Sequence, residues 1–196
     1  MKIIVWDIDD VLNDLMKEWF TNYCLHQNKL CSIKFENLIE NPPNRLLNIS
    51  EDYYLKSLDD FRKELGNRLK PLVDILSWFN KKGDLYCHFA LTSTPLFYAS
   101  SSAEWLFKNY GRWFSSFNFI PSKREGDNYS YRFLSKTSLL KIFANVDAFI
   151  DDNPQNIVEA NAIGVKTFLF PRPWNKSQYN SAKELLDDLD KLLRYQ

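Results

Sequence analysis

Short apolar runs alternate with helix-like segments along most of the chain. The first run, residues 2–6, is rich in β-branched side chains and stops at Asp7, a pattern that predicts a strand buried on both faces. Further runs predict strands over residues 84–94, 117–120, 147–152 and 166–170. The chain therefore contains the strands of one sheet, separated by stretches long enough for helices.

Between these runs, apolar residues recur at the three- and four-residue spacing of amphipathic helices. This spacing predicts helices over residues 11–28, 50–65, 71–83, 100–110, 134–146, 155–164 and 181–194. Strands that alternate with helices from about residue 70 onward are typical of an α/β fold. We expect a doubly wound, Rossmann-like parallel sheet flanked by helices.

The stretch from residue 14 to residue 68 is mostly helical and lies between the first and second predicted strands. The sequence Asn-Pro-Pro-Asn at 41–44 predicts a turn within it. We therefore expect two units. Residues 1–13 and 69–196 form the α/β core, and residues 14–68 form a small helical cap inserted after the first strand.

Composition and charge exclude several classes of protein. The 196 residues include 25 Lys and Arg and 25 Asp and Glu, and a net charge of zero does not suit a nucleic-acid polymer as partner. Neither a signal peptide nor a membrane span is evident. Cys24, Cys31 and Cys87 form no Cys-x-x-Cys pair, so we expect reduced thiols. These features predict a cytoplasmic protein without a membrane partner, and they leave its oligomeric state open.

Three predicted strands end in polar side chains that could do chemistry. They are Asp7 and Asp9 after the first, Thr92 and Ser93 after the second, and Asp151 and Asp152 after the third. Because the carboxyl ends of parallel strands share one edge of a sheet, these side chains are expected to meet there. Four carboxylates with hard oxygen donors suit Mg²⁺, and the cation would offset their mutual repulsion.

A phosphate group fits the same edge. The hydroxyl of Thr92 and the ammonium of Lys136 could bind it, and one carboxylate would be free to attack phosphorus. Simpler interpretations exist for each feature. The acids could be solvated strand ends, Thr92 and Ser93 could cap a turn, and Lys136 could be a surface charge, although a helix N-terminus disfavours lysine.

Four motifs carry a resemblance to a known family. "IIVWDIDDVL", "FALTSTP", "LSKTS" and "AFIDDNPQN" occur in this order between residues 3 and 156. Together they resemble the four motifs of the haloacid dehalogenase-like (HAD) superfamily, and the sequence is most similar to its 5'(3')-deoxyribonucleotidase-like branch. The resemblance implies a Mg²⁺-dependent phosphatase that acts on a small phosphorylated metabolite or a nucleotide, by way of an aspartyl-phosphate.

The resemblance also implies a role for each motif residue. Asp7 would be the nucleophile, and Asp9 would be the general acid and then the base, with Lys136 as the third catalytic residue. The phosphate would be bound by Thr92, Ser93 and Lys136. Mg²⁺ would be held by Asp7, the backbone carbonyl of Asp9 and Asp152, with Asp151 in support and a doubtful part for Asn156.

Other functions remain open on the same residues. A phosphotransferase or a sugar-phosphate phosphatase needs the same site, and a phosphate-binding or scaffold protein could keep the fold without turnover. A dehalogenase would need neither the metal nor Asp9, so we rank it low.

Several side chains outside the motifs also have an expected place. His88 is expected in the core, Trp19, Phe20 and Tyr23 in the interior of the cap, and Lys123 and Arg124 in solvent. For Trp174, packing against the body and contact with a ligand remain equal alternatives.

Overall fold

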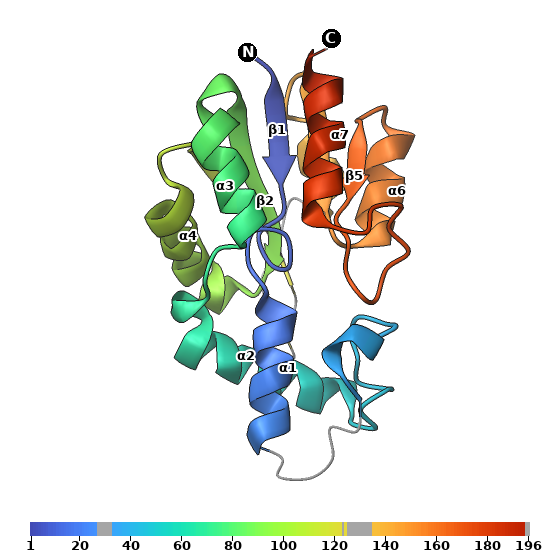
Figure 1. Cartoon of the computed structure of the whole chain (residues 1–196). Helices are drawn as coiled ribbons and strands as arrows, with labels where there is room; N and C mark the ends of the chain where they lie inside the picture. The colour runs from blue at the N-terminus through green and yellow to red at the C-terminus, as the bar shows by residue number, and fades with distance from the viewer. Residues whose placement is uncertain (27–32, 123, 125–134, 195–196) are drawn as a thin grey trace.

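The computed structural model describes residues 1–26, 33–122, 124 and 135–194. Its centre is a parallel five-stranded sheet in the order β3-β2-β1-β4-β5 (Figure 1). The strands are β1 (Ile3–Trp6), β2 (Cys87–Thr94), β3 (Phe114–Pro121), β4 (Val146–Asp151) and β5 (Thr167–Leu169). The prediction of a parallel α/β sheet is confirmed.

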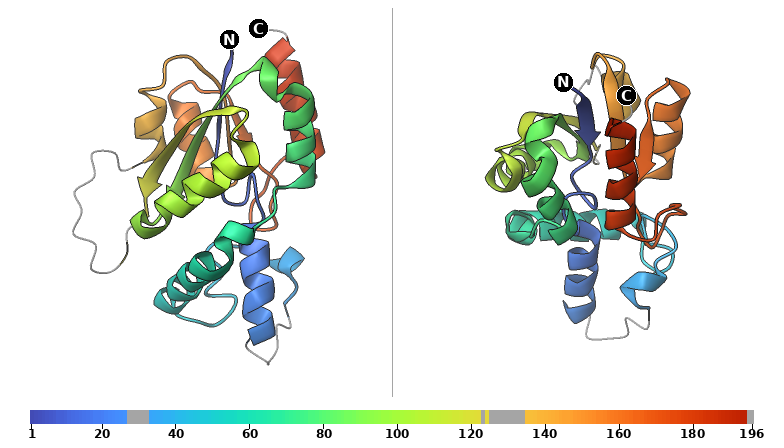
Figure 2. Two further views of the ribbon diagram at one scale, coloured as in Figure 1. Left: turned by 90° about the vertical axis from the view of Figure 1, so that its left-hand side faces the viewer. Right: turned by 45° about the horizontal axis from the view of Figure 1, so that its top comes forward.

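Helices cover both faces of this sheet (Figure 2). One face packs against α3 (Val73–Lys82), α4 (Leu96–Tyr110) and α7 (Ala182–Arg194). The other face packs against α5 (Lys136–Leu140) and α6 (Pro154–Ala162). The sheet is therefore doubly wound, as the alternation of strands and helices predicts.

β1 shows why its sequence is an unbroken apolar run. Ile4 and Trp6 belong to the core beneath α3, α4 and α7, whereas Val5 belongs to the core beneath α5 and α6. None of the three has exposed surface. Successive side chains of a strand point to opposite faces, so a strand covered on both sides must be apolar at every position.

His88 in β2 is a core residue, as predicted. Its Nδ1 accepts a hydrogen bond of 3.0 Å from Trp6 Nε1, and its Nε2 donates to the carbonyl of Gly83 at 3.0 Å. Burial lowers the pKa of His88 to about 4, so the ring is neutral at pH 7. His88 therefore connects two elements of the core and takes no part in the chemistry of the strand ends.

A group of helices between β1 and α3 forms an insert that lies beyond the carboxyl ends of the strands (Figure 1). Its described elements are α1 (Leu15–His26), the 3₁₀ turn η1 (Phe35–Asn37), α2 (Glu51–Leu65) and the 3₁₀ turn η2 (Gly66–Arg68). Trp19 and Phe20 are buried, and the Trp19 ring packs between Tyr23 and the edge of Tyr54. These aromatic side chains form the interior of the insert, as predicted.

Two strand boundaries differ from the prediction. β2 begins at Cys87 rather than at residue 84, because residues 84 and 85 belong to the 3₁₀ turn η3 (Gly83–Leu85). β3 begins at Phe114 rather than at residue 117, and the buried Phe114 ring extends its contact with the core. A short strand pattern predicts the position of a strand better than its ends.

Three helix boundaries also differ. α1 begins at Leu15 rather than at residue 11, after Asp10 adopts a left-handed φ of 61°. α4 begins at Leu96, directly after Pro95, rather than at residue 100. α5 ends at Leu140 rather than at residue 146, since turns follow it up to Asn145 with a φ of 57°. The other described helix ends lie within two residues of the prediction.

The prediction of reduced thiols is wrong for Cys24. Cys24 is disulfide-bonded, Cys87 is a free thiol, and Cys31 lies outside the residues that the structure describes. Disulfide formation depends on the distance between two Cα atoms, which cysteine spacing alone does not give. The cysteines therefore no longer support a reducing compartment. In the part of the chain that is described, no helix has the length and apolar character that crossing a membrane requires.

Candidate active site

The ends of β1 and β4 bring three carboxylates together. Trp6 pairs with Ile150, and the Asp7 amide donates a hydrogen bond of 2.9 Å to the Ile150 carbonyl. Directly after this pair, one oxygen each of Asp7, Asp151 and Asp152 lies within 4.8 Å of the others, and all three side chains are buried. Neighbouring parallel strands thus place the acids of the first and fourth motifs side by side.

Lys136 lies between two of these carboxylates. Its Nζ is 2.7 Å from Asp7 Oδ2 and 2.7 Å from Asp151 Oδ2, and its side chain is 2% exposed. Lys136 is the first residue of α5, where the Ser135 hydroxyl caps the helix by accepting from the Ser138 amide. The helix start therefore aims the lysine at the strand ends, and Lys136 is not a surface charge.

Burial and neighbouring charges shift the pKa values of Asp7 and Lys136 in opposite directions. Burial raises the pKa of Asp7 well above its usual range, although Lys136 opposes the shift. Burial alone would lower the pKa of Lys136, but the charges of Asp151 and Asp7 raise it overall. Lys136 is thus protonated, and its positive charge stabilises the ionised form of the buried Asp7 carboxylate.

Asp151 is held by donors on several sides. Its oxygens accept hydrogen bonds from Lys136, from the Asn153 amide at 2.8 Å and from Asn156 Nδ2 at 3.0 and 3.1 Å. Asn156 therefore contacts Asp151, and no hydrogen bond joins it to Asp7 or Asp152 among the described residues. This arrangement suits Asp151 as the anchor of Lys136.

Asp152 lies closer to the cavity and has fewer donors. Trp174 Nε1 donates to Asp152 Oδ2 at 3.0 Å, and Asn175 Nδ2 donates to its backbone carbonyl at 2.7 Å. Burial, followed by repulsion from Asp151, raises the pKa of Asp152 to about 8. Trp174 also packs edge-on against Phe35. Trp174 is partly buried against the hydrophobic core, so it packs against the body, and its contact with a ligand stays a prediction.

These residues fit a divalent cation with hard oxygen ligands. The donors are buried carboxylate oxygens, and their burial and mutual repulsion raise the pKa values of Asp7 and Asp152. A bound cation would remove this penalty, because it favours the ionised form of each ligand. The chemistry of the donors suits Mg²⁺, which prefers carboxylate oxygens and retains water.

The second strand motif supplies hydroxyls at the same edge. Thr92 is buried, and its Oγ1 has no hydrogen-bond partner among the described residues, while Ser93 is exposed to the cavity. A buried hydroxyl without a partner is costly unless a ligand completes its hydrogen bonds. The Thr92 hydroxyl is thus available to donate a hydrogen bond to an oxyanion.

Asp9 points toward the insert. Asp9 Oδ2 is 3.1 Å from Arg62 Nη2, and Asp9 Oδ1 accepts from Asn13 Nδ2 at 3.2 Å. Arg62, on α2, also lies 3.4 Å from Asp59 Oδ1 and stacks over the Tyr98 ring. Burial would lower the pKa of Arg62, but Asp9 raises it, so the guanidinium stays charged. The insert therefore places a buried cation on Asp9.

A cavity of about 240 Å³ connects these groups. Its core wall includes most of the side chains that the sequence singles out for chemistry, namely Asp7, Asp9, Thr92, Ser93, Lys136 and Asp152, whereas Asp151 is not part of its lining. Its opposite wall comes from the insert and includes Leu15, Met16, Tyr54, Leu58 and Arg62. The predicted site residues thus meet in one place, between the sheet edge and the insert.

The side chains of the insert wall were not among the site residues that the sequence predicts. Tyr54, Leu58 and Arg62 are spaced four residues apart on α2 and therefore share one helical face. A cation on this otherwise apolar face was the sequence feature that could have indicated a site residue. The expectation that Arg124 is solvated is wrong, since its guanidinium donates to both oxygens of Asp59 at 2.6 and 2.9 Å. Lys123 lies outside the described residues.

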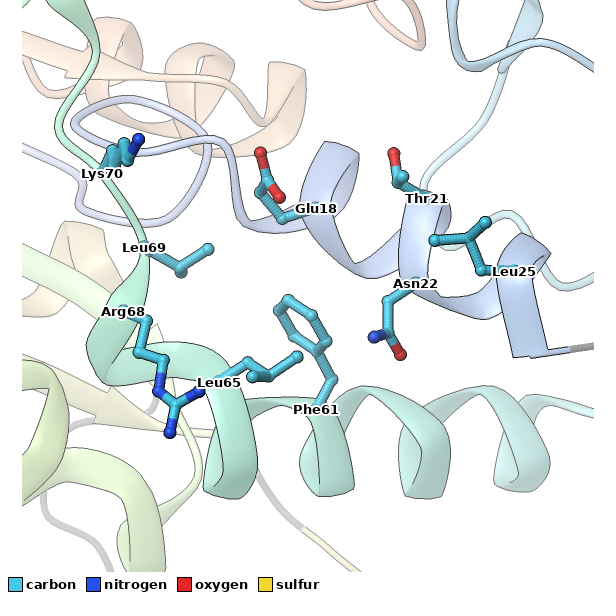
Figure 3. A pocket seen from close by; sticks show the side chains of 9 residues that line it. All are labelled: Glu18, Thr21, Asn22, Leu25, Phe61, Leu65, Arg68, Leu69 and Lys70. Atoms are coloured by element: carbon cyan, nitrogen blue, oxygen red, sulfur yellow. The ribbon is translucent and has the colours of Figure 1, made fainter.

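A second hollow, of about 360 Å³, lies between α1 and α2 (Figure 3). Phe61 and Leu65 of α2 face Asn22 of α1 across it, and Arg68 lies at one end. Its lining includes one carboxylate, Glu18, and no residue of the four motifs. The chemistry suggested by the sequence is therefore confined to the strand ends.

No protein-family model matches the sequence, and no curated protein matches it. Solved structures do share its fold. A hydrolase of the haloacid dehalogenase-like family from Streptococcus pneumoniae is 13% identical, with a TM-score of 0.60 over 100% of this chain and 99% of that one. A protein described as a predicted phosphatase from Clostridium acetobutylicum is 16% identical, with a TM-score of 0.62 over 98% of both chains.

A third solved structure is similar to this chain to about the same extent. A protein described as a predicted phosphoglycolate phosphatase from Haemophilus somnus is 15% identical, with a TM-score of 0.60 over 97% of both chains. At such identities the likeness concerns the path of the chain, and it extends over nearly the whole chain. The chain has the fold of the haloacid dehalogenase-like hydrolases, as its four motifs predict.

Proposed function

We propose that this protein is a Mg²⁺-dependent phosphatase that hydrolyses a small phosphomonoester through an aspartyl-phosphate. One observation carries the proposal. Lys136 bridges Asp7 and Asp151 beside Asp152, so a carboxylate, a fixed cation and a further acid face one cavity. The phosphatases among the structures of the same fold support the same reaction class.

In the first step, an Asp7 oxygen attacks phosphorus, and the bond from phosphorus to the leaving oxygen breaks. Asp9 gives its proton to that oxygen, so the alcohol leaves uncharged and Asp7 carries the phosphoryl group. Lys136 holds Asp7 in place through its 2.7 Å contact. The lysine also offsets negative charge on the phosphoryl oxygens.

In the second step, water attacks the phosphorus of the aspartyl-phosphate. Asp9, now ionised, takes a proton from the water, and the bond between phosphorus and the Asp7 oxygen breaks. The products are inorganic phosphate and free Asp7. The same carboxyl group thus serves as acid and then as base, and it is protonated again at the end of the cycle.

Phosphate binding falls to Thr92, Ser93 and Lys136. The unpartnered Thr92 hydroxyl and the exposed Ser93 hydroxyl can donate to phosphoryl oxygens, and Lys136 supplies a positive charge. Asp7, Asp152 and the backbone carbonyl of Asp9 would hold Mg²⁺, which supplies charge neutralisation on the transferring group. Asp151 would keep Lys136 in position.

We propose residues 14–68 as a cap over a core made of residues 1–13 and 69–196. Tyr54, Leu58 and Arg62 of the insert line the cavity, so they contact the leaving group of any substrate held at Asp7. A nucleoside monophosphate is one candidate substrate, because Tyr54 offers an aromatic ring to a base. Sugar phosphates and phosphorylated small acids are the others.

The test is hydrolysis of para-nitrophenyl phosphate and of a phosphomonoester panel with Mg²⁺. We expect turnover by the wild type, loss of at least about a thousandfold in Asp7→Asn, and no turnover in EDTA. Asp187→Asn, at an exposed position on α7, is the matched control. Activity that survives Asp7→Asn would reject the assigned nucleophile.

Companion measurements of halide release, ligand binding and phosphate transfer separate the competing functions. Halide release that ignores EDTA would indicate a dehalogenase, and Mg²⁺ and phosphate binding without turnover would indicate a binding or scaffold protein. Transfer of phosphate to an added alcohol in preference to water would indicate a phosphotransferase.

A further inference from the structure

The insert presents a buried hydroxyl to the active-site cavity. Tyr54 of α2 lines this cavity and is 4% exposed. Within the described residues, the polar side-chain atoms that are sealed from solvent without a hydrogen-bond partner belong to Arg62, Thr92, Thr94 and Trp113. The Tyr54 oxygen is not one of them, and it makes no hydrogen bond in the described part of the chain. The hydroxyl therefore opens on the cavity with its hydrogen bonds still to be made.

The ring of Tyr54 is fixed by packing before any ligand binds. Trp19 of α1 lies against it at an interplanar angle of 90°, with the two ring centroids 5.0 Å apart. Because so little of the side chain is exposed, the ring offers a ligand only a small surface. The hydroxyl is thus the part of Tyr54 that suits a specific contact, since a fixed donor costs little entropy when it binds.

The hydroxyl is a neutral donor. Burial raises the pKa of Tyr54 above its usual value, so the phenol keeps its proton at neutral pH. The charges of Arg62 and Arg124 oppose this shift, whereas those of Asp10 and Asp152 add to it. The phenol oxygen therefore lies within electrostatic range of acids at the strand ends, and its proton can be donated to a ligand held between the two walls.

The rest of the lining suits a leaving group without charge. The insert contributes three apolar side chains to the cavity, Leu15, Met16 and Leu58. The two cations of the lining, Arg62 and Lys136, each contact two carboxylates already. An anionic leaving group would lose its water here without gaining a free counter-charge, which is costly. A neutral group would pay no such penalty.

Resting on the proposed function, the geometry points to Tyr54 as a specificity-determining residue that donates a hydrogen bond to an acceptor oxygen of a neutral, compact leaving group. The cavity of about 240 Å³ must hold the phosphoryl group as well, and typical ligand pockets span about 300–1,000 Å³, so the leaving alcohol is small. Its acceptor is an ether, carbonyl or hydroxyl oxygen. Among the candidate substrates, the phosphates of small sugars have these features.

The test measures ligand binding to Asp7→Asn with Mg²⁺ by titration calorimetry, so that turnover does not interfere. Two pairs of ligands each differ by one acceptor. 2-Methoxyethyl phosphate has an ether oxygen where n-butyl phosphate has a methylene group, and hydroxyacetone phosphate has a carbonyl oxygen where 2-methylpropyl phosphate has a methyl group. Adding Tyr54→Phe should weaken binding of the acceptor-bearing member of at least one pair about 3- to 10-fold, the range of a neutral hydrogen bond. Its partner should bind nearly as before.

The variant and its control separate recognition from a structural role. Tyr54→Phe keeps the ring that packs on Trp19 and removes only the hydroxyl. Because this hydroxyl has no partner within the described residues, the free energy of unfolding in urea should not fall, whereas loss of a structural hydrogen bond would lower it. Tyr53→Phe is the matched control, since Tyr53 is the preceding residue of α2 and is 45% exposed. It should leave the affinities of both pairs unchanged.

A third comparison tests the preference for a neutral leaving group. 2-Phosphoglycolate and hydroxyacetone phosphate differ by a carboxylate oxygen against a methyl group. We expect hydroxyacetone phosphate to bind more tightly to Asp7→Asn, because its leaving group needs no counter-charge. Equal or tighter binding of 2-phosphoglycolate would overturn the restriction to neutral leaving groups.

Failure of the inference and failure of the proposed function are distinguishable. If Tyr54→Phe weakens both members of each pair equally, or weakens neither, the role of Tyr54 is rejected even where the wild type hydrolyses phosphomonoesters. If the wild type hydrolyses none of them while Asp7→Asn keeps a Tyr54-dependent preference, the proposed function fails and the inference about Tyr54 stands.

Discussion

The two walls of the cavity hold their charges in different ways. On the core wall, Lys136 is 2% exposed and contacts Asp7 and Asp151, which stand at the ends of adjacent strands. On the insert wall, Arg62 lies in the last turn of α2, where it contacts Asp9 of the core and Asp59 of its own helix. The core pairing depends on strand register, whereas the insert pairing depends on how a helix docks.

This difference matters for the division of labour in the site. Groups fixed by the sheet keep their spacing whatever the leaving group is, so they suit the step common to all substrates. Groups that cross between the insert and the core depend on the docking of the insert, so they suit discrimination among leaving groups. Substitutions on the core wall should therefore affect all substrates alike, and substitutions on the insert wall should affect some more than others.

Lys136→Met gives the largest expected effect and tests the core wall. It leaves Asp7 and Asp151 without their shared cation, and breaking such a buried pair costs about 3–5 kcal/mol of unfolding free energy. Urea unfolding measures this loss. Turnover should fall about a thousandfold or more on every substrate in the panel.

Lys141→Met is the matched control, since Lys141 lies at the exposed end of α5. An equal loss of unfolding free energy in both variants would mean that the buried contacts of Lys136 contribute no more to stability than an exposed lysine does. A loss of turnover confined to one substrate class would break the distinction between the two walls.

The core wall could be anticipated from the sequence because its information is local. A buried run followed by acids predicts a strand end, and parallel strands bring their ends to one edge. Asp7, Thr92 and Asp152 therefore come together from three distant stretches, as expected. The position of Lys136 also follows, because Ser135 marks the start of α5 as a capping residue.

The insert wall could not be anticipated in the same way. Helical spacing shows that Tyr54, Leu58 and Arg62 share a face, but it does not show what that face docks against. Arg124 is 18% exposed only because α2 brings Asp59 to it, a contact across 65 positions of the chain. The disulfide of Cys24 escaped prediction for the same reason, since it depends on distances in space.

Trp174→Phe gives the next largest effect. The ring remains to pack on Phe35, but the hydrogen bond from Nε1 to Asp152 is lost. Loss of a partner that orients a metal ligand typically weakens metal affinity about 10- to 100-fold. The Mg²⁺ concentration needed for half-maximal activity should rise by that factor.

Trp113→Phe is a matched control for Trp174→Phe, because Trp113 Nε1 is buried without a hydrogen-bond partner among the described residues. It removes an indole N–H that orients nothing. A similar rise in the Mg²⁺ requirement for both variants would show that Trp174 acts on the metal site only through general stability.

Arg124→Gln tests how firmly the insert is held on the core. It removes two charged hydrogen bonds to Asp59 at a mostly buried position, and we expect a loss of about 2 kcal/mol in unfolding free energy. Arg112→Gln, at a surface pair with Asp84 where the arginine is 67% exposed, should cost less than about 1 kcal/mol. Equal losses would indicate that the Arg124 contact is no stronger than a surface pair.

Substitution of His88 has the smallest expected effect, and it tests whether the sheet interior is uncharged, in contrast to both walls of the cavity. Its pKa is lowered to about 4 by burial, whereas an unfolded histidine titrates near 6.5. As pH falls below about 6.5, the unfolded chain takes up a proton that the native state refuses, so the stability contributed by neutral His88 declines. Between pH 7 and pH 5.5 the loss is about 1 kcal/mol.

The measurement is the difference in unfolding free energy between the wild type and His88→Gln at the two pH values. The carboxylates of the site titrate in both proteins, so their contributions cancel in this comparison, and the difference should shrink by about 1 kcal/mol on acidification. His26→Gln, at an exposed position, is the control. Identical pH dependence for the two histidine variants would mean that His88 is not held neutral by burial. In that case the sheet interior would hold a titrating charge, as the two walls of the cavity do, and the comparison could not treat it as neutral.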